Sequence, residues 1–340
     1  MRLLLITDLH FTDKPVGLLE AQKKCILRLL QEEKPTEVII MGDLMMYRKP
    51  SPSVLLALKE VVDYLKRKDV PLTILRGNHD SETKADDGVT ALSLYNYHAD
   101  VITEYCVDHQ WERAWIPHYE DENYIKELLK KIPEGYTVYG HFGYYGSLNS
   151  VGDADFNIEL SDFRTPTFLG HVHGYLEKEN VTILGTPYTT NFGEAFKDSF
   201  YAILDDGGPR SKRNTGWVNS KGNTYTVTLR TLNHGPRHLV YAAKDIEANL
   251  EDINDPEWFT MLRILVDIDH HPIPYDKLKV PYIDVKYNPV FNEEEVSSYE
   301  PERNLFSINE MIIEDYVDGA NSIIPKEVLM KGYRSLKDEN

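Results

Sequence analysis

The chain has 340 residues, of which 41% are hydrophobic and 27% are charged, and these ordinary globular proportions exclude a disordered or fibrous protein. Its formal net charge of −18 argues against binding nucleic acid by bulk electrostatics, which needs clustered Lys and Arg. An enzyme that meets phosphates through bound cations stays compatible with that charge. Two cysteines are too few for a disulfide framework, and no apolar run approaches the ~20 residues of a membrane span. We therefore expect a cytoplasmic protein without membrane contact.

The first 205 residues alternate between short apolar runs and segments with helical periodicity. The apolar runs predict strands, and the periodic segments predict helices. The second helix begins at Pro52, behind Ser51 as an N-cap. Alternating strands and helices are typical of an α/β domain. The expected strands are 2–6, 38–41, 72–75, 136–139, 167–169 and 181–184, and the expected helices are 18–30, 52–65 and 122–132.

The composition changes near residue 205, where a turn-rich polar stretch begins. Further strands are expected at 225–232 and 261–268. The last 50 residues are acidic and hold only short apolar clusters. These changes predict three regions: a first domain at 1–205, a smaller second domain at 206–290, and a C-terminal segment at 291–340.

Polar side chains follow five of the predicted strands, each just beyond a Gly or another small residue. In α/β folds, ligands bind outside the carboxyl ends of the strands, so these side chains are expected to converge. The five sequences are Asp8-Leu9-His10, Gly42-Asp43, Gly77-Asn78-His79-Asp80, Gly140-His141 and Gly170-His171-Val172-His173.

The residue types indicate metal ligands. Seven oxygen and imidazole donors are too many for one tetrahedral ion and suit two ions that share a carboxylate. No cysteine lies near these motifs, and the mixed donors favour manganese, iron or zinc over calcium or a thiolate-bound metal. Two such ions can clamp both the attacking and the leaving oxygen of an in-line displacement. The candidate ligands are Asp8, His10, Asp43, Asn78, His141, His171 and His173.

The five sequences match, in order, the motifs of calcineurin-like metallophosphoesterases, and the resemblance covers about residues 1–200. It implies a layered α/β core with two central β-sheets flanked by helices, followed by a small α+β capping domain and a C-terminal tail. It also implies that Asp8, His10, Asp43 and His173 hold one metal ion. The other ion would be held by Asp43, Asn78, His141 and His171, with Asp43 as the bridge.

The same resemblance assigns catalytic roles to His79 and Asp80. His79 would contact the scissile phosphate without binding metal and would protonate the leaving oxygen. Asp80 would orient His79, or it would simply be a turn residue.

Two further segments resemble SbcD-type DNA repair nucleases: Arg48-Lys49-Pro50-Ser51-Pro52, and residues 183–187 after the last motif. This resemblance implies a DNA exo/endonuclease that acts in recombination and repair with an SbcC-like ATPase subunit. The metal would be Mn²⁺, with Mg²⁺ as the alternative. The length resembles the nuclease subunit of large tailed bacteriophages, which would place the protein in the host cytoplasm. The alternative function is a small-molecule phosphodiesterase or phosphatase whose second domain is a lid.

Other features are interpreted more simply. The apolar clusters of 291–340 are expected to dock the ATPase subunit, and a homodimer is left open. His118 and six other histidines match no motif and are expected to be surface or packing residues. Tyr144 and Tyr145 either stack on a nucleotide base or pack within their loop. Met46 stands where SbcD-type enzymes of cells often carry a histidine.

Overall fold

The computed structural model describes residues 1–84, 88–147, 156–195, 197–206, 214–218, 224–266 and 272–287. The chain divides into two compact units, Met1–Asn288 and Pro289–Asn340. All described residues belong to the first unit, so the predicted docking segment at 291–340 lies outside them. No helix of the described residues is long and apolar enough to cross a membrane.

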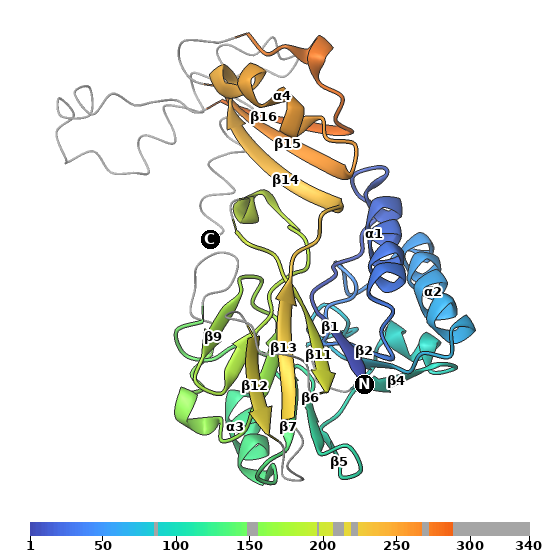
Figure 1. Ribbon diagram of the computed structural model, residues 1–340, viewed down its shortest axis with the longest axis vertical. Helices are drawn as coiled ribbons and strands as arrows, with labels where there is room; N and C mark the ends of the chain where they lie inside the picture. The colour runs from blue at the N-terminus through green and yellow to red at the C-terminus, as the bar shows by residue number, and fades with distance from the viewer. Residues whose placement is uncertain are drawn as a thin grey trace, which may run out of the picture. The chain divides into compact units, whose positions relative to one another are not determined.

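Two β-sheets form the centre of the first unit (Figure 1). The seven-stranded sheet has the order β12-β13-β11-β1-β2-β3-β4, and the six-stranded sheet has the order β5-β6-β7-β8-β10-β9. The strands of the first are β1 (Arg2–Ile6), β2 (Glu37–Ile40), β3 (Leu72–Leu75), β4 (Ala99–Ile102), β11 (Tyr201–Asp206), β12 (Asn214–Val218) and β13 (Thr224–Arg230). The strands of the second are β5 (Cys106–Asp108), β6 (Arg113–Ile116), β7 (Thr137–His141), β8 (Thr167–Gly170), β9 (Leu176–Lys178) and β10 (Val181–Ile183).

Helices cover the outer faces of both sheets, as the alternating side chains of β1 show. Leu4 and Ile6 pack with the apolar sides of α1 (Leu18–Glu33) and α2 (Pro52–Arg67). Leu3 and Leu5 point the other way, into the core shared with the six-stranded sheet. Because successive residues of a strand face opposite sides, one apolar run serves both layers. Helix α3 (Glu122–Lys131) packs on the second sheet. The predicted α/β core with two central sheets flanked by helices is confirmed.

The strand expected at 225–232 belongs to the seven-stranded sheet. It corresponds to β13, which pairs antiparallel with β11 in the register Tyr201↔Arg230. Val227 lies between the two sheets and is buried there. The apolar face of β13 therefore packs into the core between the two sheets. This packing explains why the strand joins the seven-stranded sheet and not a separate domain.

A third, smaller sheet follows, with three parallel strands in the order β14-β15-β16. It has an apolar cluster of its own. Short helical turns complete the described chain. The bounds are β14 (Gly235–Ala242), β15 (Trp258–Val266), β16 (Tyr282–Tyr287), α4 (Leu250–Ile253), η1 (Ala91–Tyr95), η2 (Leu160–Asp162), η3 (Phe192–Glu194), η4 (Ala243–Asp245), η5 (Glu247–Asn249) and η6 (Tyr275–Lys277).

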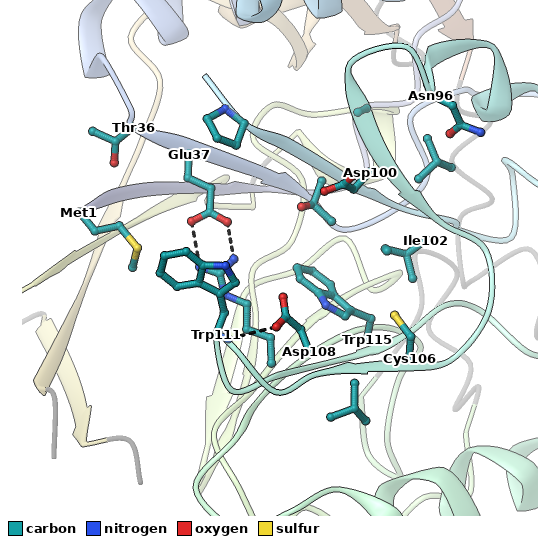
Figure 2. Close-up of a pocket in the computed structure, with 16 residues that line it drawn as sticks. Met1, Thr36, Glu37, Asn96, Asp100, Ile102, Cys106, Asp108, Trp111 and Trp115 are labelled. Atoms are coloured by element: carbon teal, nitrogen blue, oxygen red, sulfur yellow. Dashed lines mark hydrogen bonds and ion pairs between the residues drawn. The ribbon is translucent and has the colours of Figure 1, made fainter. Parts of the chain in front are cut away.

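A cavity of about 680 Å³ opens where the edge strands β4 and β5 of the two sheets come together (Figure 2). Glu37 and Arg113, the first residues of β2 and β6, form a bidentate ion pair in its wall. The cavity therefore lies at the amino ends of these strands. The motif residues follow the carboxyl ends, so their site lies at the opposite end of the sheets.

Candidate metal centre

The motif residues meet at the carboxyl ends of five strands. Asp8 and His10 follow β1, Asp43 follows β2, and Asn78 follows β3 in the first sheet. His141 ends β7, and His171 and His173 follow β8 in the second sheet. Hydrogen bonds join these loops: Asp8 N donates to Gly42 O at 3.0 Å, and His171 N donates to the Asp8 side-chain oxygen Oδ2 at 3.0 Å. The structure thus brings together all seven predicted ligands, from both sheets.

Several ligand candidates have left-handed backbones. The φ angles are 54° at Asp8, 45° at His10, 50° at Asp43 and 84° at His171. Such angles are uncommon for residues other than glycine and cluster at functional sites, where the surrounding structure holds the strain. Four of the eight described non-glycine residues with positive φ are thus ligand candidates.

The first group of donors surrounds the rings of His10 and His173. Their Nε2 atoms lie 3.0 Å apart, and Asp8 Oδ1 lies 3.9 Å from each. Asp43 Oδ2 lies 3.8 Å from His10 Nε2. Burial lowers the pKa of His10 to about 3. Its ring is therefore neutral at physiological pH and can offer a nitrogen lone pair to a metal ion. An imidazole nitrogen of His173 and carboxylate oxygens of Asp8 and Asp43 within 4 Å of His10 Nε2 suit a divalent transition-metal ion.

The second group uses the other oxygen of Asp43. Asp43 Oδ1 lies 3.4 Å from His141 Nε2, and Asn78 Oδ1 lies 3.2 Å from that nitrogen and 2.9 Å from His171 Nδ1. His141 Nδ1 donates to the carbonyl of Met41 at 2.6 Å, which leaves Nε2 facing the group. Although burial lowers the pKa of His141, the charge of Asp43 outweighs it and raises that pKa to about 9. A bound cation would take the place of this proton.

Asp43 therefore has one oxygen in each group, as a bridging ligand requires. Its side chain is almost fully buried. Although burial opposes ionisation, the charge and hydrogen bond of His141 hold the pKa of Asp43 well below its usual range. The residues present fit a pair of divalent ions: Asp8, His10, Asp43 and His173 would hold one, and Asp43, Asn78, His141 and His171 would hold the other.

His79 lies beside the first group. Its ring stands edge-on to that of His10 with centroids 5.0 Å apart. Its backbone N donates to Asp43 Oδ1 at 2.8 Å, and its Nδ1 donates to the carbonyl of Met46 at 2.6 Å. This leaves Nε2 as the ring atom available to a substrate.

Asp80, for which the sequence leaves both an orienting role and a turn role open, contacts the backbone of two loops. Its carboxylate is fully buried and accepts three backbone N–H groups, from Leu44 at 3.0 Å, Met45 at 3.2 Å and Gly77 at 3.0 Å. Burial, and then the charge of Asp43, raise the pKa of Asp80 to about 7. Asp80 thus links the loop after β2 to the loop after β3 by hydrogen bonds. The carbonyl of Met46 is the group that orients the ring of His79.

Comparison with known proteins identifies the family. Residues 1–207 match the calcineurin-like phosphoesterase family, which is more than half of the chain.

The chain belongs to the calcineurin-like phosphoesterase family.

A calcineurin-like phosphoesterase hydrolyses phosphate esters, and its family uses divalent metals, which agrees with the donor groups around Asp43. Among solved structures, the chain is similar to the crystal structure of Pseudomonas putida nuclease MPE. The two share 16% sequence identity over 69% of this chain and 77% of that chain, with a TM-score of 0.30. No curated protein matches the sequence.

Two side chains of this phosphoesterase site carry no sequence signal. Glu194 Oε1 accepts a hydrogen bond from His173 Nδ1 at 2.6 Å. Glu194 lies 21 residues after His173 in the sequence and belongs to none of the five motifs. His118 is buried with its ring centroid 5.6 Å from that of His171. Burial lowers the pKa of His118 to about 2. His118 packs as expected, but it does so against the ligands.

The two tyrosines after His141 differ in their burial. Tyr144 is buried in the core of the second sheet, whereas the side chain of Tyr145 is 60% exposed. Packing is therefore the role of Tyr144, and Tyr145 alone stays available for stacking.

Gly77→Ala is expected to disrupt the phosphoesterase site. A Cβ at this position would lie 2.1 Å from Asp43 Oδ1 and 2.4 Å from Asp43 N. Because backbone must move to relieve such a contact, we expect a loss of about 1–3 kcal/mol in the free energy of unfolding and weaker Mn²⁺ binding. Urea denaturation and calorimetric Mn²⁺ titration measure the two effects. Gly174→Ala is the control, because its Cβ meets nothing within 4 Å; equal behaviour of the two variants would contradict the prediction.

Proposed function

We propose that the protein is a metal-dependent DNA nuclease of the SbcD type that hydrolyses phosphodiester bonds. The observation that carries the proposal is the pair of donor groups that share Asp43, with His79 beside them. Mn²⁺ is the proposed ion and Mg²⁺ the alternative. The SbcD type rests on the resemblance of residues 48–52 and 183–187, and an origin in a tailed bacteriophage rests on the resemblance in length alone.

The side chains divide the work of the reaction. When bound, two divalent ions lower the pKa of a water and neutralise charge on the phosphate. The neutral ring of His10 would offer the lone pair of a ring nitrogen to one ion. Asp43, which has one oxygen in each donor group, would offset the positive charge of both ions. The carbonyl of Met46 accepts from Nδ1 of His79 and leaves Nε2 facing the substrate; the doubly protonated ring would pass its Nε2 proton to the leaving oxygen and keep the Nδ1 proton on the carbonyl. Asp8 fixes the loop after β8 by accepting from His171 N.

A polar cavity of about 300 Å³ beside the second group supports a polynucleotide substrate. Its wall includes Asn78 and His171, two cationic side chains, Arg48 and Lys84, and two carboxylates, Glu120 and Glu122. Arg48 Nη1 donates to the carbonyl of Thr83 at 2.7 Å, which fixes the guanidinium at the cavity. Although Glu120 and Glu122 balance the formal charge of the lining, the fixed guanidinium of Arg48 suits a phosphate that flanks the scissile one. A small diester has no such phosphate.

Arg48→Met is expected to raise KM for single-stranded DNA and to leave KM for bis-p-nitrophenyl phosphate unchanged. The loss of one charge-assisted hydrogen bond of ~1.5 kcal/mol corresponds to about a tenfold rise. The salt dependence of DNA binding should fall by about one charge. Arg67→Met, at an exposed position of α2, is the control. Hydrolysis of the small diester without any cleavage of DNA would favour the alternative, a small-molecule phosphodiesterase.

We further propose that an SbcC-like ATPase subunit binds residues 291–340 and supplies the grip on DNA that an acidic nuclease lacks. Deleting 291–340 should spare hydrolysis of bis-p-nitrophenyl phosphate and abolish the stimulation of DNA cleavage by the ATPase. Copurification and nuclease assays with the ATPase subunit measure both. If the shortened chain still copurifies with the ATPase, the docking proposal is wrong.

A further inference from the structure

One segment joins the metal centre to the third sheet. It consists of Thr189, Thr190, Asn191 and the turn η3, and we refer to residues 189–194 as the coupling loop. Its last residue contacts a predicted ligand, and other residues contact the third sheet, β14-β15-β16.

Toward the metal centre, Glu194 holds His173. The carboxylate is only 2% exposed, and its Oε1 accepts from His173 Nδ1 at 2.6 Å. The coupling loop fixes this carboxylate in turn: Thr190 N donates to Oε2 at 2.7 Å and Asn191 Nδ2 donates to Oε1 at 2.6 Å. Because Nδ1 donates to Glu194, the lone pair of His173 is on Nε2, the atom that faces His10. Such outer carboxylates fix the tautomer and orientation of histidine ligands.

Toward the third sheet, the ring of Phe192 is surrounded by one residue from each strand. The guanidinium carbon of Arg263 on β15 lies 4.0 Å from its centroid. His238 on β14 and Tyr282 on β16 have ring centroids 4.8 Å and 6.4 Å away. Three residues earlier in the loop, Thr189 Oγ1 accepts from His238 N at 2.7 Å. The sheet therefore fixes the coupling loop at two points.

We propose that Glu194 is a positioning residue for His173 and that its position depends on the third sheet through Phe192. A shift of the sheet then changes the affinity of the ion that His173 holds, and binding of that ion stabilises the sheet's contact with the loop, because coupling between sites is reciprocal. This inference rests on the proposed role of His173 as a ligand.

The test is calorimetric Mn²⁺ titration of the full chain and of three variants. Glu194→Gln should weaken one of the two binding steps about 10- to 100-fold, the range for such outer partners. Phe192→Leu should weaken the same step by about twofold to tenfold. Arg237→Met is the matched control: Arg237 lies on β14 of the same sheet and contacts Trp258 and Asp252 instead of the coupling loop. It should leave both steps unchanged.

A second measurement separates the coupling from the ligand assignment. In the metal-free chain, the Nδ1 proton of His173 should give a downfield NMR resonance that Glu194→Gln removes, Phe192→Leu shifts and Arg237→Met leaves in place. If Phe192→Leu changes neither the resonance nor the titration, or if Arg237→Met changes them equally, the coupling is wrong. If His173→Ala leaves Mn²⁺ binding intact, the ligand assignment fails, while the NMR comparison still decides the coupling.

Discussion

Asp43→Ala is expected to abolish hydrolysis of both DNA and bis-p-nitrophenyl phosphate, the largest effect of any single substitution at the site. One oxygen of Asp43 lies 3.8 Å from His10 Nε2 and the other lies 3.4 Å from His141 Nε2. The variant therefore loses a ligand from both donor groups at once. It also leaves the buried ring of His141 without the carboxylate that balances its charge. Turnover and Mn²⁺ binding should both fall below detection.

Asp100→Ala serves as the control, because Asp100 is an exposed residue of β4 beside the cavity at the other end of the sheets. It should retain normal turnover and normal metal content. An Asp43→Ala chain that still binds two Mn²⁺ ions would show that Asp43 is not the bridge. Comparable unfolding curves for the two variants would exclude a general loss of structure.

His79→Gln is expected to slow DNA cleavage by about 10²–10⁴-fold, the usual contribution of a general acid. A sugar hydroxyl leaves poorly without a proton, whereas p-nitrophenol is acidic enough to leave as the anion. The loss should therefore be much smaller with bis-p-nitrophenyl phosphate. Rates with the two substrates, measured at saturating Mn²⁺, give the comparison.

Metal binding distinguishes the acid from a ligand. His79 has a ring nitrogen close enough to His10 and Asp43 to join a ligand group. If it acts as the acid alone, the Mn²⁺ titration of His79→Gln should match that of the parent chain. A lost binding step would instead make His79 a ligand. His109→Gln, at an exposed position on the second sheet's edge, controls for the substitution itself.

The sequence predicts the core of this fold well because local signals agree with the packing. The strands of the predicted core are short apolar runs, and the polar residue that follows each one is local to it. Neighbouring strands with this pattern place their donors at one edge, so Asp8 and Asp43 could be placed together without knowledge of the contacts.

Elements that depend on distant contacts are not visible in the same way. Helix α1 continues through Glu33, past the predicted end at residue 30. Its last turn is polar, and Glu33 is buried because Tyr201 Oη donates to it at 2.7 Å and Arg230 Nη1 donates to it at 2.7 Å. Likewise, β9 has only three residues and an exposed, charged end. Hydrophobic periodicity carries no record of these long-range partners.

The candidate site likewise contains residues that local sequence predicts and groups that it does not. Its ligands occur in motifs, but the groups that orient them come from backbone or from isolated residues. The carbonyl of Met46 orients His79, and a carbonyl has no sequence signature. Glu194 is a single acidic residue after the last motif, and only the fold brings it to His173. The bracing by Asp80 depends on backbone N–H groups of two separate loops.

The most direct test of the two-ion site is metal content measured alongside activity. The full chain is titrated with Mn²⁺, and samples are analysed by elemental mass spectrometry and by hydrolysis of bis-p-nitrophenyl phosphate. Because Asp43 has an oxygen in each donor group, activity should reach its maximum only as the content approaches two ions per chain. Full activity in a sample that holds one ion per chain would contradict the account.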